Sequence, residues 1–185
     1  MTGTHITFSV NDADVRAMLE RQAEPGTGRL VPRLGEYLQA STKERFKTEI
    51  APDGTPWEKL KTATIRRKKY NPDKVLTLRG YLRGSIRWQE LSPGSVAVGT
   101  NMEYAAIHQF GGDIQQPARQ ATVRYRSVAG RVLFAGRKHK RATEHQVMIP
   151  AHTVKMPARP YLGISAQDDR EILEIIRDYV VERNR

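Results

Sequence analysis

The sequence predicts an α+β fold: N-terminal helices and a C-terminal helix packed on a small antiparallel sheet, with an extended basic β arm. Apolar residues recur at spacings of three or four in residues 34–46 and again in 172–180, which is typical of amphipathic helices. Between these segments, short alternating runs flank turn residues, as they do in β-hairpins. A chain of 185 residues is long enough for one domain with an extension.

The first expected elements are a strand and a helix. Residues 6–10 alternate apolar and polar side chains, which predicts a short strand. Asn11 or Asp12 can then cap a helix, because either side chain accepts hydrogen bonds from free backbone N–H groups. The Pro-Gly-Thr-Gly run at 25–28 ends this helix.

A second helix is predicted from about Pro32, a residue that suits the first helical turn. Its apolar positions include Tyr37 and Phe46, which we expect on the buried side. The helix ends at residues 51–57, where Asp-Gly between two prolines is typical of a turn. Trp57 is expected to seal one end of the core.

The middle of the chain predicts short elements. Residues 62–70 predict a short basic helix, and the apolar series in 76–86 predicts a short helix that leads into a strand. Residues 87–91 and 95–98 flank Ser-Pro-Gly and predict a β-hairpin. Residues 104–108 predict one helical turn, ended by a Gly-Gly pair.

Residues 113–156 differ from the rest in charge and in pattern. They carry nine basic and two acidic residues, so the net charge of +11 is concentrated here. Alternating runs predict two pairs of strands, first 122–126 with 132–134 and then 147–149 with 153–155. A polar loop at 136–141 lies between the pairs. Because a two-stranded arm is marginal in water, we expect it to become ordered against a neighbour.

The predicted organisation is one domain interrupted by this arm. Residues 1–112 supply the N-terminal helices and central sheet, 113–156 the basic β-arm insertion, and 157–185 the C-terminal helix of the same domain. Ser165 and Asp168 predict a capping box at the start of that helix, with Asp in place of the usual Glu.

Composition and motifs argue against catalysis and bound cofactors. The chain has no cysteine, which removes disulfides and thiolate chemistry and fits a reducing compartment. None of its five histidines has the H-x-x-x-H or H-E-x-x-H spacing of metal sites, and neither a serine elbow nor a phosphate loop is present. We therefore expect no enzymatic activity, no cofactor and no metal. A hydrolase of unknown type that uses His108 is the alternative.

The basic runs 66–69 and 137–141 leave two interpretations open. They can contact nucleic-acid phosphates, with aromatic side chains interleaved as in single-strand binders. They can also form a solvated face, or an arm that pairs with acidic subunits, since the sequence contains no known nucleic-acid-binding motif. The arm residues considered for inter-subunit or DNA contact are Arg124, Tyr125, Arg126, Arg137, Lys138 and Arg141.

The chain carries no sign of export or membrane insertion. Its N-terminus lacks a basic patch followed by an apolar run. No apolar run approaches the ~20 residues of a membrane-spanning helix. We expect a soluble protein made in a cytoplasm, with no membrane partner.

Two short segments on either side of the arm combine turn residues with aromatic anchors. They are residues 98–112 (VGTNMEYAAIHQFGG) and 156–165 (MPARPYLGIS). The two prolines around Arg159 hold its guanidinium on a stiff backbone, which suits a bidentate ion pair or backbone carbonyl contacts. The residues expected to serve packing and subunit contact are Tyr104, His108, Phe110, Gly111, Arg159, Pro160 and Tyr161.

These motifs resemble the phage virion morphogenesis family, the tail-completion proteins of Mu-like tailed phages. Four segments match in order over most of residues 31–183. They are PDG at 52–54 with Trp57, LRGYLRGSI at 78–86, VGTN to HQFG at 98–111, and IP at 149–150 with PARPYLG at 157–163. The chain departs from the family at Arg79-Gly80, where Thr-Gly or Ser-Gly is common, and at Tyr161, which replaces a usual Phe.

The resemblance implies a structural, non-enzymatic role in tail completion or head–tail joining during virion assembly. It implies ring oligomers, expected as hexamers on the symmetry of the tail tube, with tail-tube or head–tail connector proteins as partners. The expected location is the tail or neck of the virion, after assembly in the bacterial host cytoplasm. An arm that docks on the next subunit is one way to close such a ring, and a nucleic-acid-binding module that uses the basic arm is the alternative.

Overall fold

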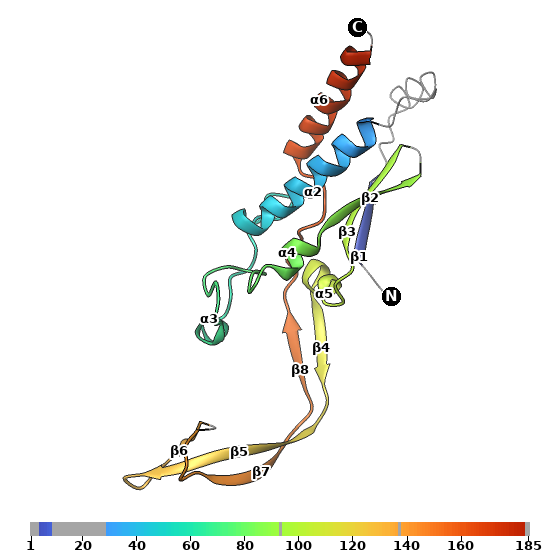
Figure 1. Ribbon diagram of the computed structural model, residues 1–185. Coiled ribbons are helices and arrows are strands. Elements are labelled where there is room, and N and C mark those ends of the chain that lie inside the picture. The colour runs from blue at the N-terminus through green and yellow to red at the C-terminus, as the bar shows by residue number, and fades with distance from the viewer. Residues whose placement is uncertain (1–3, 9–28, 93, 137, 184–185) are drawn as a thin grey trace. The chain divides into compact units, whose positions relative to one another are not determined.

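The computed structural model describes residues 4–8, 29–92, 94–136 and 138–183 (Figure 1). It divides into two units, Met1–Gly111 with Pro157–Arg185, called the body, and Gly112–Met156, called the arm. Helices and small antiparallel sheets make up the two units, so the predicted α+β class is confirmed. The expected helix after Asn11 lies outside the described residues.

The body contains a three-stranded antiparallel sheet in the order β1-β3-β2. Its elements are β1 (Thr4–Phe8), α2 (Leu30–Thr48), α3 (Thr62–Arg67), α4 (Tyr81–Ser85), β2 (Arg87–Ser92), β3 (Ser95–Thr100), α5 (Ala105–Phe110) and α6 (Ala166–Arg183). The predicted hairpin is confirmed, since β2 pairs with β3 with Trp88 opposite Val98. The first strand pairs with the other side of β3, with Ile6 opposite Val98.

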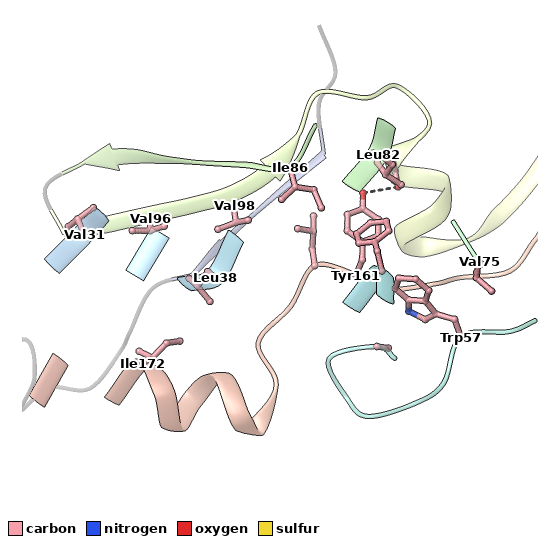
Figure 2. Close-up of a cluster of buried hydrophobic side chains, with 14 residues drawn as sticks. Val31, Leu38, Trp57, Val75, Leu82, Ile86, Val96, Val98, Tyr161 and Ile172 are labelled. Carbon is pink, nitrogen blue, oxygen red and sulfur yellow. Dashed lines mark hydrogen bonds between the residues drawn. The ribbon is translucent and has the colours of Figure 1, made fainter. Parts of the chain in front are cut away.

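Helix α2 packs on this sheet, and α6 packs on α2 (Figure 1). The core is apolar and includes Leu38, Val98 and Ile172 (Figure 2). The last helix buries Ile172 and Tyr179, as its predicted apolar stripe requires. Long helices with one apolar face are stabilised mainly by such packing rather than by local propensity.

A close approach between α2 and β2 depends on Gly35. A Cβ atom at this position would lie 2.4 Å from Cδ2 of Trp88, so no side chain fits between the helix and the indole ring. Trp88 lies in the half-buried layer packed against the core. Glycine has low helical propensity, but at this interior position of the helix it leaves room for the Trp88 ring of the sheet.

Two predicted helices are shorter than expected. The basic helix ends at Arg67 rather than near residue 70. In the series 76–86 only α4 is helical, because Leu76 (φ 50°) and Gly80 (φ 78°) adopt left-handed conformations that interrupt a right-handed helix. Gly80 then forms the N-terminal boundary of α4.

The arm consists of a two-stranded ladder followed by a three-stranded sheet (Figure 1). The ladder pairs β4 (Gly112–Gln116) with β8 (His152–Met156). The sheet has the order β6-β5-β7, built from β5 (Arg119–Val128), β6 (Arg131–Phe134) and β7 (Thr143–Ile149). The predicted pairing of 122–126 with 132–134 is confirmed, since Tyr125 lies opposite Phe134.

The predicted pairing of 147–149 with 153–155 is wrong. Strand β7 pairs instead with β5, and β8 pairs with β4. Only Pro150 and Ala151 separate β7 from β8, and a two-residue hairpin loop normally needs positive φ. Proline fixes φ near −65°, so Pro150 prevents this turn and each strand finds a more distant partner.

In this way the arm forms a single layer. None of its described residues is buried, whereas the body has an apolar core. Sheets normally bury one face against a second layer of structure. The arm's own described residues provide no such layer.

We predict that Gly35→Ala destabilises the body by about 1–3 kcal/mol, the usual cost of overpacking a well-packed site. Denaturant unfolding followed by circular dichroism measures this loss. The matched control is Gly84→Ala in α4, where no atom lies within 4 Å of the added Cβ. Equal stability of the two variants would contradict the close contact between Gly35 and Trp88.

Candidate functional site

The two motif segments on either side of the arm meet inside the body. Gln109 of α5 accepts hydrogen bonds at Oε1 from the backbone N–H groups of Tyr161 and Leu162, both at 3.0 Å. Its Nε2 donates to the carbonyl of Leu162 at 3.0 Å. One buried amide side chain therefore satisfies three backbone groups of the segment 157–163.

Tyr161 anchors that segment in the core. Its side chain is fully buried, with the ring centroid 5.2 Å from that of Phe46. The hydroxyl donates to the carbonyl of Ala105 at 3.3 Å, the hydrogen bond drawn dashed in Figure 2. Burial raises the pKa of Tyr161 to about 12, so the hydroxyl keeps its proton and remains a donor.

Arg159 is buried and contacts the backbone. Its side-chain Nε donates to the carbonyl of Glu58 at 2.9 Å, and its backbone N–H donates to the carbonyl of His108 at 2.8 Å. The carbonyl of Pro160 accepts from Nε1 of Trp57 at 2.8 Å. Of the two contacts that the sequence predicted for this guanidinium, the structure shows the one with a backbone carbonyl.

A buried ion pair fixes the other end of the segment. Arg45 of α2 pairs with Asp168 of α6, and their side chains are 8% and 2% exposed. One terminal nitrogen of Arg45 also donates to the carbonyls of Tyr161 and Gly163, at 2.8 and 2.9 Å. The guanidinium thus ties two helices to the motif segment.

Both carboxylate oxygens of Asp168 accept hydrogen bonds. Oδ1 accepts from the hydroxyls of Tyr37 (2.9 Å) and Ser41 (2.5 Å), and Oδ2 accepts from the N–H and hydroxyl of Ser165. Burial alone would raise the pKa of Asp168. The hydrogen bonds from Ser41, Ser165 and Tyr37 together outweigh it, so the pKa lies below its usual value.

The predicted capping box is confirmed, because the N–H of Asp168 donates back to Oγ of Ser165 at 3.2 Å. The ion pair between Asp168 and Arg45 was not predicted from the sequence. Its signal was present, since Arg45 occupies an apolar position of the predicted second helix. An arginine at such a position needs a buried partner or a route to solvent.

The parts of the four family-like segments that belong to the body pack in this one region, whereas residues 149–150 of the fourth belong to the arm. A Cβ at Gly163 would lie 2.6 Å from Cγ of Pro52, which places the early turn against the motif segment. Leu82 and Ile86 of the second segment belong to the same buried cluster as Tyr161. The motifs therefore maintain a shared structural junction.

The residues expected to serve packing and subunit contact fall into two groups. Arg159 and Tyr161 are buried and Pro160 is half-buried, so they serve packing. Tyr104 and Phe110 at the two ends of α5 are 43% and 66% exposed. Gly111 ends α5 with a positive φ of 70°. Subunit contact through the exposed pair stays a prediction.

His108 lies half-buried beside this junction. Its ring is 5.9 Å from that of Tyr104, and Nδ1 is buried with no hydrogen-bond partner among the described residues. Burial, and to a smaller degree the charge of Arg159, lowers its pKa below 6.5. The contacts of this ring in the described part of the chain are those of a packed side chain.

The described ranges contain little that points to a metal site, a hollow lined by ionisable side chains or a membrane-spanning helix. These ranges hold no group of three or more His, Cys, Asp or Glu side chains that fits a metal ion. A hollow of about 670 Å³ beside β2 and β3 has a single ionisable side chain, Arg87, in its lining. None of the described helices combines the length and apolar content needed to cross a membrane.

The arm residues singled out in the sequence have separate environments. Arg124 forms an ion pair with Glu144 at 3.0 Å, and Arg126 lies 3.3 Å from Nε2 of His139. The ring of Tyr125 packs 5.2 Å from that of Phe134. Lys138 and Arg141 are exposed in the loop after β6. Arg137 lies outside the described residues.

Comparison with known proteins identifies the family. The sequence model of the phage virion morphogenesis family matches residues 10–181. The chain belongs to this family. It is 28% identical over 175 residues to the putative capsid assembly protein G of Escherichia phage Mu, which covers 90% of each chain. It is 30% identical over 177 residues to the Mu-like prophage FluMu G protein 2 of Haemophilus influenzae, or 94% of this chain and 95% of the relative. No solved structure matches significantly.

We predict that Asp168→Asn destabilises this family member by about 3–5 kcal/mol, because it leaves the buried charge of Arg45 without its counter-ion. Urea unfolding measures the loss. Glu182→Gln, which breaks the exposed ion pair with Arg33, is the matched control and should leave stability unchanged within error. A small effect of Asp168→Asn would show that the ion pair does not hold the junction.

We predict that His108 makes the body less stable in mild acid. Its folded-state pKa lies below that of the unfolded chain, so the unfolded state binds more protons as the pH falls through about 6.5. Unfolding free energies at pH 7.5 and 5.5 measure the effect. The difference should shrink in His108→Gln, and an unchanged difference would show that His108 is not responsible.

Proposed function

We propose that this protein is a structural component that completes the phage tail or joins it to the head during virion assembly, as a ring of identical copies. Membership in the virion morphogenesis family supports the assembly role. The name of the phage Mu relative, putative capsid assembly protein G, supports the same role. The observation that carries the oligomeric part of the proposal is an uncovered apolar face on the arm.

That face follows from the strand register. Alternate residues of β5 share a face, and the residues opposite them in β6 and β7 lie on the same side. Phe134 and Val132, at 77% and 70%, are among the most exposed apolar side chains of the described residues. The apolar side chains on this side of the sheet form the apolar arm face, and they are Ala121, Val123, Tyr125, Val132, Phe134, Val147 and Ile149. The polar residues on the same side are Arg119, Ser127, Thr143 and His145.

The opposite face is largely polar, although it also exposes Val128, Leu133 and Met148. It carries the ion pair between Arg124 and Glu144. Arg124 and Arg126 both reach His139, at its carbonyl and ring nitrogen, so the loop after β6 contacts this face. The apolar arm face has no equivalent cover among the arm's described residues. An uncovered apolar patch of this kind is typical of an interaction site.

A second copy of the chain is the occupant that we propose. Every copy carries one arm, and an arm that docks on the next copy forms a head-to-tail interface that can close into a ring. Six copies match the symmetry expected for a tail tube. The proposed partners are tail-tube or head–tail connector proteins, and the proposed location is the tail or neck of the virion. DNA contact through the basic arm is the alternative that the sequence leaves open.

We predict that Phe134→Asp moves the protein toward monomer, because a carboxylate on the apolar arm face must lose its hydration to enter an interface. Sedimentation velocity across a concentration series measures the shift. Met148→Asp is the matched control, since Met148 is 62% exposed on the opposite face of the same sheet. A wild-type chain that is monomeric at every concentration and salt, or equal effects of the two variants, would reject the proposal.

Electron microscopy of particles made without this protein tests the assembly role itself. Tails of uncontrolled length indicate a protein that terminates the tail, and finished tails without heads indicate a connector. Normal infectious particles would contradict both forms of the proposed function.

A further inference from the structure

The charge of the chain has a second centre, in the body. Residues 59–79, called the basic loop, carry eight basic residues and one acidic residue, a net of +7. Residues 113–156 also carry +7, so the remaining residues sum to −3 against the total of +11. The basic loop and the arm therefore carry equal net positive charge, and the surplus is not confined to the insertion.

Six of the eight cations of the basic loop are exposed, and every residue of α3 lies on the surface. No cation of the loop forms an ion pair within the described part of the chain. Each exposed guanidinium or ammonium group can therefore bind an anion. The exposed cations are Lys59, Lys61, Arg66, Arg67, Lys69 and Arg79.

The loop is held in one shape by its own polar groups. Lys68 turns inward, and its Nζ donates to the carbonyls of Lys74 at 2.5 Å and Thr77 at 2.9 Å. Asn71 donates through Nδ2 to the carbonyl of Leu78 at 3.0 Å. These bonds span six to nine residues of sequence and close the loop across its width.

A buried residue anchors the loop to the body. The side chain of Val75 is 2% exposed and belongs to the core cluster that contains Phe46 and Trp57. Its N–H donates to Oε1 of Glu49 at 2.7 Å. The positive charges are consequently presented on a fixed frame, which reduces the entropy lost when they bind a ligand.

An aromatic side chain lies among the cations. Tyr70 is 42% exposed, with Nζ of Lys69 at 5.4 Å and Cζ of Arg79 at 5.2 Å from its ring centroid. Arg79 also reaches the hydroxyl of Tyr81, which is 61% exposed. Surfaces that bind nucleic acid combine basic groups with exposed aromatic rings in this way.

We propose that the basic loop binds the phosphate backbone of nucleic acid. Like charges crowded on a rigid frame repel one another, and a polyanion relieves this repulsion along its whole length. A second copy of the chain offers few acidic groups to neutralise the basic loop, because its residues outside the basic loop and the arm have a net charge of only −3. The exposed tyrosines favour nucleic acid over an acidic protein surface. This inference does not depend on the ring or on the apolar arm face.

The test measures binding of a fluorescein-labelled DNA duplex by fluorescence anisotropy over a range of salt concentrations. The full-length chain is compared with a triple variant, Arg66→Gln, Arg67→Gln and Lys69→Gln. The matched control is Lys138→Gln, Lys140→Gln and Arg141→Gln, which removes the same charge from the arm. All six side chains are exposed, and a thermal melt checks that each variant is folded.

Each lost phosphate contact reduces the slope of log affinity against log salt by about 0.9. We expect the loop variant to lose about 2.7 from this slope and the arm variant to keep the wild-type slope. Equal loss in both variants would show that binding follows net charge alone, and no binding near physiological salt would also overturn the proposal. Loop-dependent binding of polyglutamate as tight as that of DNA would assign the surface to an acidic protein instead.

Discussion

The buried ion pair between Arg45 and Asp168 is the interaction on which the rest of the body depends. Burying two charges costs more than their attraction returns unless further hydrogen bonds satisfy them. Here the guanidinium also binds two backbone carbonyls, and the carboxylate accepts from Tyr37, Ser41 and Ser165. The network joins α2, α6 and the segment 157–163. The segment that follows the arm is thereby fixed where the chain returns to the body.

The sequence predicted the elements whose signals are local. Apolar spacing identified α2 and α6, turn residues identified the β2–β3 hairpin, and Ser165 with Asp168 identified a cap. The partners of β7 and β8 could not be predicted from local sequence, because the paired residues lie 18 to 44 positions apart in the chain. Gln109 was missed for a similar reason. A glutamine in a helical turn carries no sign that its amide will bind backbone groups 52 and 53 residues later.

The structure also changes the role assigned to the motif residues. Arg159 and Tyr161 were expected to serve packing and subunit contact, and they lie in the interior, where they hold the junction together. The proposed contacts with other molecules involve features with less distinctive sequences, the apolar arm face and the basic loop. The first offers apolar area without a second layer, and the second offers fixed positive charge without counter-ions among the described residues. This division fits a protein that acts by assembly.

Cryo-electron microscopy of the oligomer formed by the purified full-length chain tests this account most directly. The account predicts a closed ring in which the apolar arm face of each copy, centred on Tyr125 and Phe134, is buried against the next copy. A ring closed through other surfaces, with that face open to solvent on every copy, would contradict it.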